Sequence, residues 1–127
     1  MQMDLAGYRA SFDKLWGYTN VVRLGAEHLS DDGNIVLVSG APARRAKPGQ
    51  AAIASVGGAV EQFVRAVTAE LAPKRINVVR PGVIDTPMFG NDADARATML
   101  GGATAKNLIP RAGTPEEVAE GIMFVVK

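Results

Sequence analysis

Hydrophobic side chains recur at helical spacing in two long stretches of this chain. From residue 12 to 29 an apolar or small residue returns every three or four positions, and a second set of this kind runs from residue 50 to 71. Residues at such intervals share one face of an α-helix. We therefore predict long helices over 12–29 and 50–71. Ser11 is expected to cap the first helix, and Asp13 falls in its first turn, where the helix dipole favours an acidic residue.

Two short runs rich in apolar residues, IVLV at 35–38 and INVV at 76–79, are typical of β-strands. The first run is expected to be buried on both faces, as strands of parallel sheets are. The order helix–strand–helix–strand–helix implies parallel strands joined by a crossover helix. The pattern thus predicts an α/β fold with a partial, Rossmann-like, doubly wound parallel sheet.

The other segments have no long periodic pattern. We expect an irregular lead-in over 1–11 and a loop over 41–50, which is rich in proline and basic residues. A short helix is expected over 93–100, followed by the flexible pair at 101–102. The sequence TPEE at 114–117 has the form of a capping box with proline at the first helical position. The last helix should therefore begin there and run to the C-terminus.

Glycine marks two places where the backbone has a special task. Gly57 and Gly58 lie inside the second long helix and weaken it by about 1 kcal/mol each relative to alanine, so we expect close packing against another backbone there. Pro81 and Gly82 end the second strand and turn the chain. The residues at 83–86 then lie beyond a strand's carboxyl end, where open parallel sheets place their ligand crevice.

Composition narrows the class of protein. The chain has 127 residues, enough for a single domain over 1–127, with 47% apolar and 21% charged residues. A formal net charge of +1 argues against binding nucleic acid as the main task. There is no cysteine and only one histidine, His28, so we expect no metal site. Neither a signal peptide nor a membrane-spanning apolar run is evident, so a soluble, cytoplasmic protein is expected.

Three segments resemble the short-chain dehydrogenase/reductase superfamily. GNIVLVSG at 33–40 is similar to the family's fifth strand and the turn after it. Residues 59–88 are similar to its long catalytic helix, sixth strand and Pro-Gly turn, and RAGTPEEVAEGIMFV at 111–125 to its last helix. The resemblance covers most of residues 12–127. It implies a Rossmann fold that binds NAD or NADP, and a homo-oligomer, most simply a dimer formed through the two long helices.

The resemblance also defines what the chain does not contain. The family's Gly-rich turn, which holds the cofactor pyrophosphate, has no counterpart in this sequence. Two parallel strands are too few for an independently stable sheet, so we expect a longer chain or another chain to complete it. The expected cofactor contacts are those of the nicotinamide side: Pro81, Gly82, Ile84 and Thr86.

The family's catalytic residues are replaced at all four matching positions. By resemblance its serine, tyrosine and lysine fall at Gly40, Ile53 and Gly57, and its asparagine at Lys14. Ser39 stands one place early, where a strand side chain faces the other way. Isoleucine cannot exchange a proton, so no catalytic residue is assigned.

Two hypotheses follow from different classes. The first is an NAD(P)-dependent oxidoreductase of this family, or a fragment or diverged form of one, that acts on a small carbonyl or hydroxyl substrate. The second is a catalytically inactive pseudoenzyme that serves as a dimerising interaction module. Two further alternatives concern cations. Lys14 could replace the catalytic base, and Arg44, Arg45 and Lys47 could clamp a phosphate, against the plainer interpretation of solvated side chains.

Overall fold

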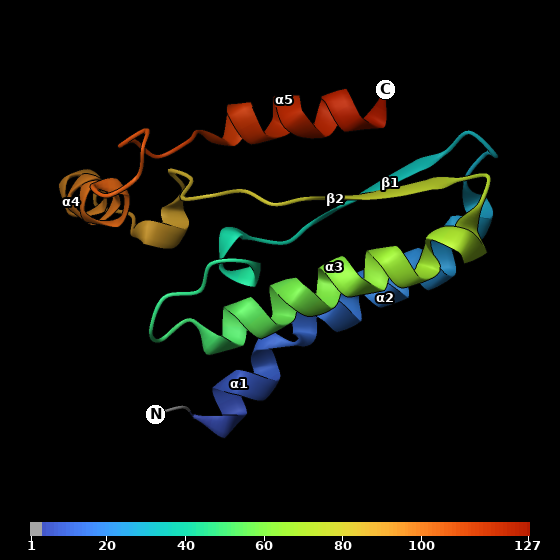
Figure 1. Ribbon diagram of the computed structural model, residues 1–127, viewed down its shortest axis with the longest axis horizontal. Coiled ribbons are helices and arrows are strands. Elements are labelled where there is room, and N and C mark those ends of the chain that lie inside the picture. The colour runs from blue at the N-terminus through green and yellow to red at the C-terminus, as the bar shows by residue number, and fades with distance from the viewer. Residues whose placement is uncertain (1–3) are drawn as a thin grey trace. The chain divides into compact units, whose positions relative to one another are not determined.

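The computed structural model describes residues 4–127, which form two compact units (Figure 1). The first unit extends to Arg80, and the second runs from Pro81 to Val125. In the first unit the chain follows the predicted order of alternating helices and strands. Its elements are α1 (Leu5–Ser11), α2 (Asp13–Gly25), β1 (Asn34–Val38), α3 (Ala51–Leu71) and β2 (Arg75–Val79), with short 3-10 turns at Ala26–His28 and Ala41–Ala43.

The two strands pair in parallel, in register from Asn34 opposite Arg75 to Val38 opposite Val79. This pairing confirms the predicted side-by-side, co-directional strands and, with α3 as their crossover, the partial Rossmann-like α/β fold. The predicted helix over 12–29 is somewhat shorter and ends in a 3-10 turn, whereas the one over 50–71 is matched almost residue for residue.

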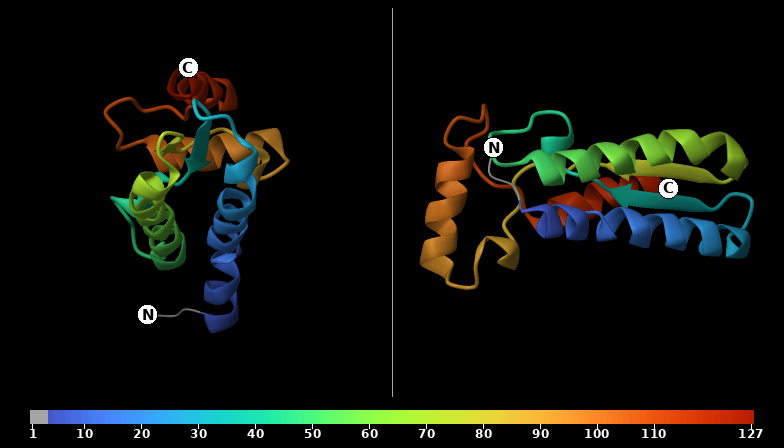
Figure 2. Two further views of the ribbon diagram at one scale, coloured as in Figure 1. Left: turned by 90° about the vertical axis from the view of Figure 1, so that its right-hand side faces the viewer. Right: turned by 90° about the horizontal axis from the view of Figure 1, so that it is seen from below.

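A single apolar core lies between the sheet and the two long helices. Figures 1 and 2 show α2 and α3 on the same side of the sheet. Alternate strand residues face this side because successive side chains point to opposite faces. The buried residues of this core are Val22 from α2, Val60 and Val64 from α3, and Leu37 and Ile76 from the strands. Partly buried side chains, including Ile35 and Val78 from the strands, pack against them. Only Leu37 of β1 is fully buried, so the strand expected to be buried on both faces is half-buried in this two-stranded sheet.

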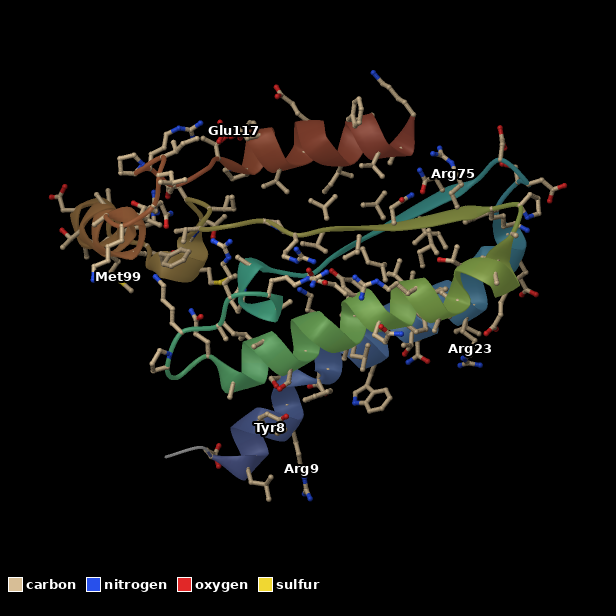
Figure 3. All side chains as sticks on the ribbon, viewed as in Figure 1. Tyr8, Arg9, Arg23, Arg75, Met99 and Glu117 are labelled. Carbon is tan, nitrogen blue, oxygen red and sulfur yellow. The ribbon has the colours of Figure 1, made fainter. Side chains whose placement is uncertain are left out.

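The expected irregular lead-in is wrong where the structure describes it, because residues 5–11 form α1; residues 1–3 lie outside the described residues. The Asp4 carboxylate caps α1 by accepting hydrogen bonds from the backbone N–H groups of Ala6 and Gly7, at 3.2 and 2.7 Å. Ser11 ends α1 instead of capping α2, and its hydroxyl donates to the Tyr8 carbonyl at 2.6 Å. Figure 3 shows Tyr8 and its neighbour Arg9 on this short helix, which has too few turns to give a periodic pattern.

The second unit contains the 3-10 turn Pro87–Phe89 and the helices α4 (Ala93–Thr104) and α5 (Pro115–Val126). Helix α4 continues through Gly101 and Gly102, so the flexible break predicted there is wrong. Beyond the glycines the helix is anchored by Thr104, which is 1% exposed and whose hydroxyl donates to the Leu100 carbonyl at 2.8 Å. The start of α5 is as predicted: the Thr114 hydroxyl accepts from the Glu117 N–H, and the Glu117 carboxylate accepts from the Thr114 N–H.

Candidate functional site

A buried carboxylate lies at the carboxyl ends of the two strands in the first unit. Glu61 projects from α3, and its side chain is 5% exposed. It accepts two hydrogen bonds of 2.6 Å from the guanidinium of Arg80, the residue after β2, and one of 2.8 Å from the hydroxyl of Ser39, the residue after β1. Arg44 Nε lies 3.9 Å from the same carboxylate. One anion on the helix thus ties both strand ends to α3.

The charge state of Glu61 follows from these contacts. The hydrogen-bonded Arg80 guanidinium lowers the pKa of Glu61 from 4.5 to about 2, against the opposing effect of burial. The Ser39 hydroxyl and the positive charge of Arg44 contribute smaller parts of this lowering of the pKa of Glu61. Glu61 is therefore ionised throughout the physiological pH range.

An ammonium group reaches the same place from α2. Lys14 Nζ lies 3.4 Å from the Ser39 carbonyl oxygen and 5.7 Å from the centre of the Tyr18 ring, whose hydroxyl donates to the Val38 carbonyl at 3.3 Å. Burial of the amine lowers the pKa of Lys14. Within residues 4–127, no carboxylate lies within 4.0 Å of this amine. Lys14 thus brings a positive charge to the end of β1 without an acidic partner.

The positions matched to the family's catalytic residues differ in how much space they have. A Cβ added to Gly57 would lie 3.0 Å from the Cβ of Ala43, in the 3-10 turn after β1. A lysine at 57 would therefore require that turn to move. Gly40 has room for a side chain, since its nearest contact would be Pro42 at 3.6 Å, and Ile53 is 54% exposed. The close packing predicted for Gly57 and Gly58 is correct for Gly57 but wrong for Gly58. A Cβ added to Gly58 would meet no other atom within 4 Å.

Residues 81–86, here called the Pro-Gly corner, belong to the second unit. Hydrogen bonds join this corner to Gly113, which precedes Thr114, the N-cap of α5. Gly113 N–H donates to the Val83 carbonyl, and Asp85 N–H donates to the Gly113 carbonyl, both at 2.9 Å. These bonds form a short parallel bridge between Ile84 and Gly113. From α4, Arg96 Nε lies 2.8 Å from the Asp85 carboxylate. The segment that follows the turn is therefore held on two sides.

The predicted cofactor contacts all lie along this segment. Pro81, Ile84 and Thr86 are partly exposed and Gly82 is exposed, so all four are accessible in the second unit. Thr86 precedes the turn Pro87–Phe89, and its side chain makes no capping hydrogen bond there. Their role as nicotinamide contacts stays a prediction.

Two findings concern other kinds of site. Across residues 4–127 no three or more acidic or histidine side chains gather as metal ligands would. In the same part of the chain, no helix has the length and apolar character needed to cross a membrane.

The ion network around Glu61 was missed from the sequence, although a signal was present. Glu61 stands on the face of α3 that also carries Gly57, Val60 and Val64, at spacings of three and four. A lone carboxylate within an apolar helical face must find a partner when it is buried. The pattern does not identify Arg80 and Ser39 as partners, because both are distant in the chain.

Comparison with known proteins gives a consistent result. The whole chain, residues 1–127, matches the family described as enoyl-(acyl carrier protein) reductase. A short-chain dehydrogenase/reductase of Stachybotrys chlorohalonatus, ATR9, is 36% identical over 94 residues, which are 74% of this chain and 37% of that protein. A cyclopentanol dehydrogenase of a Comamonas species is 42% identical over 98 residues, 74% of this chain and 38% of that protein.

Solved structures agree with these sequence matches. The crystal structure of a small-chain dehydrogenase in complex with NADPH superimposes with a TM-score of 0.92 at 26% identity, covering 99% of this chain and 58% of that one. The chain spans well under half the length of the two curated relatives above and somewhat over half of this structure.

Proposed function

This chain belongs to the short-chain dehydrogenase/reductase family, and on that premise we propose that it is part of an NAD(P)-dependent oxidoreductase acting on a small carbonyl or hydroxyl compound. The observation that carries the proposal is the Pro-Gly corner, fixed by the bridge between Ile84 and Gly113. In this proposal the corner forms the nicotinamide side of a dinucleotide groove.

The proposed task of the corner residues is binding and orientation. Pro81 and Gly82 present a turn with no side chain beyond the proline ring, so a flat ring can approach the backbone closely. Thr86 carries a hydroxyl that can donate to or accept from an amide such as the nicotinamide carboxamide. The relative solved with NADPH supports a dinucleotide as the ligand.

Proton transfer is not assigned to this chain's family positions. Residue 53 is isoleucine, and residue 57 is a glycine whose side-chain space is taken by Ala43. An active oxidoreductase would therefore draw its proton from a group elsewhere, and the proposal requires of this chain only that it bind and orient the dinucleotide.

Dinucleotide binding is tested by thermal unfolding of the chain with NADH and with NADPH. A ligand present at 100 times its dissociation constant should stabilise the folded state by about 2.7 kcal/mol. Thr86→Ala should reduce this stabilisation by weakening the affinity. Thr98→Ala is the matched control, since Thr98 lies on α4 and its hydroxyl bonds only within the helix, to the Asp94 carbonyl at 3.0 Å. Absence of a shift with both cofactors would count against the proposal.

A second candidate, a dimeric module without catalysis, rests on a different observation. Helix α2 exposes Trp16, Val21 and Leu24 at 59%, 65% and 57%. A groove lined by Val22 and Phe63, among others, lies between α2 and α3. Large exposed apolar side chains of this kind mark contact surfaces. We propose that a second copy, or the remainder of a longer chain, covers them.

The dimer is tested by light scattering after size-exclusion chromatography. Val21→Asp should shift the mass from twice that of the chain to that of a single copy, because it places a carboxylate in the proposed interface. Asn107→Asp, in the exposed segment after α4, adds the same charge away from α2 and is the control. A monomeric wild-type chain would contradict the homodimer.

A further inference from the structure

We propose that the carboxyl ends of β1 and β2 bind a small oxyanion, a phosphate or carboxylate group, between Lys14 and Arg44. The proposal goes beyond dinucleotide binding, since it uses none of the corner residues at 81–86 and lies within the first unit. It begins from the balance of charge around Glu61.

Three cationic side chains surround one carboxylate at these strand ends. Arg80 is fully engaged by Glu61 through two hydrogen bonds of 2.6 Å. Arg44 approaches the same carboxylate only to 3.9 Å, and its side chain is 61% exposed. Within residues 4–127, Lys14 donates one hydrogen bond, to the Ser39 carbonyl at 3.4 Å, and its amine also lies over the Tyr18 ring. The pair Glu61–Arg80 is therefore neutral, and two positive charges remain uncompensated beside it.

Lys14 is held in a place that disfavours its charge. Its amine is desolvated enough to lower its pKa, and Lys14 is the second residue of α2, where the positive end of the helix dipole opposes a cation. Neither effect is offset by a carboxylate within 4.0 Å in the described part of the chain. A bound oxyanion would offset both.

Lys14 and Arg44 both lie beside the hydrogen bond between Ser39 and Glu61. Lys14 meets the backbone oxygen of Ser39, while the Ser39 hydroxyl donates to one oxygen of Glu61 and Arg44 lies nearest the other. Both side chains are exposed enough to be reached from solvent. Ammonium and guanidinium groups together suit an oxyanion, the first as a point charge and the second as a fork of donors.

Arg45, in the loop after β1, provides a control residue for testing the role of Arg44 in anion binding. Arg45 follows Arg44 directly and is also exposed, yet it takes part in no ion pair within residues 4–127. Of the cations at 44–47 considered as a phosphate clamp, only Arg44 faces the strand ends. A binding site here should depend on Lys14 and Arg44 and be indifferent to Arg45.

The test is titration of the chain with sodium phosphate, and separately with sodium acetate, by calorimetry and thermal unfolding. Ionic strength is held constant with sodium chloride, because phosphate also stabilises compact states without binding to a site. We expect saturable binding of at least one of the two anions. Lys14→Gln and Arg44→Gln should each weaken it about tenfold or more, and Arg45→Gln should leave it unchanged.

The arms of the experiment separate the possible outcomes. Binding of phosphate alone assigns a phosphate-bearing ligand, and binding of acetate assigns a carboxylate. Equal affinity in Lys14→Gln, Arg44→Gln and Arg45→Gln, or no saturable binding of either anion, would overturn the proposal. Thr86→Ala should not alter anion binding, so failure of the dinucleotide proposal is distinguishable from failure of this one.

Discussion

Two arginine–glutamate pairs, one in each unit, have nearly the same geometry and very different surroundings. Glu61 and Arg80 are joined by bonds of 2.6 and 2.6 Å, and Glu117 and Arg111 by bonds of 2.6 and 2.9 Å. In both pairs the guanidinium lowers the pKa of the carboxyl to about 2. The Glu61 side chain is 5% exposed, whereas that of Glu117, labelled in Figure 3, is 45% exposed.

Burial, more than hydrogen-bond geometry, is expected to determine how much each pair contributes to stability. An exposed pair contributes about 0–1 kcal/mol because water solvates both partners when they separate. Removing one partner of a buried pair costs about 3–5 kcal/mol because the other charge stays desolvated. The Glu117–Arg111 pair therefore supports a local helix cap. The Glu61–Arg80 pair joins α3 to the end of β2, 19 residues along the chain.

The largest expected effect comes from neutralising the two glutamates in turn. Glu61→Gln should lower the free energy of unfolding by about 3 kcal/mol. Glu117→Gln should lower it far less, since its pair is exposed and glutamine can still complete a capping box. Urea denaturation followed by far-UV circular dichroism measures both. Fluorescence of Trp16, the single tryptophan, follows the first unit separately. Equal losses in the two variants would show that the buried environment of Glu61 is not what distinguishes the pairs.

Lowering the pH should reduce the stability of the first unit, because it protonates the Glu61 carboxylate. The folded pKa of Glu61, about 2, lies below its ordinary value of 4.5, so between these pH values the unfolded chain binds a proton that the folded chain does not. The stabilisation is complete above pH 4.5 and is lost as pH falls towards 2, by about 3 kcal/mol in total. Urea midpoints between pH 6 and 2.5, monitored by Trp16 fluorescence, give the profile. In Glu61→Gln this part of the dependence should vanish; an unchanged profile would assign it to other carboxylates.

The smallest effect is expected from the adjacent glycines of α3. Gly58→Ala should stabilise the chain by up to about 1 kcal/mol, because alanine is the better helix former and the site is open. Gly57→Ala should be less stable than Gly58→Ala by about 1–2 kcal/mol, since its Cβ would lie 3.0 Å from that of Ala43. Thermal unfolding of the two variants, which share the same gain in helix propensity, measures the packing difference directly. Equal stabilities would mean that the turn at Ala41–Ala43 yields without cost.

Most of the regular structure could be predicted because its causes are local. The capping box at Thr114–Glu117 and the apolar face of α3 are each formed by residues only a few positions apart in the chain, so the sequence pattern predicts them. The incorrect predictions concern helices whose periodic pattern is short or whose tertiary contacts outweigh local helix propensity. Helix α1 has only 7 residues, and α4 passes through Gly101 and Gly102 to end at the buried Thr104.

The sequence predicted which family residues the candidate site lacks, but it did not predict how the site is packed. The loss of the family's tyrosine and lysine is read directly from Ile53 and Gly57. That the space beside Gly57 is occupied by Ala43 could not be read, since no spacing rule relates the turn after β1 to that point of α3.

By itself, the sequence determined where the two long helices, the two strands and the last helix form, that the strands run in parallel, and that the family's proton-transfer residues are absent. These properties depend on neighbouring residues, on chain order and on residue identity. Only the tertiary structure decided that Glu61 is buried yet ionised, because its partners Ser39 and Arg80 lie 22 and 19 residues away and meet it only when both strands end against α3. Folding brings these charges together, and their energy depends on how much water it removes from around them.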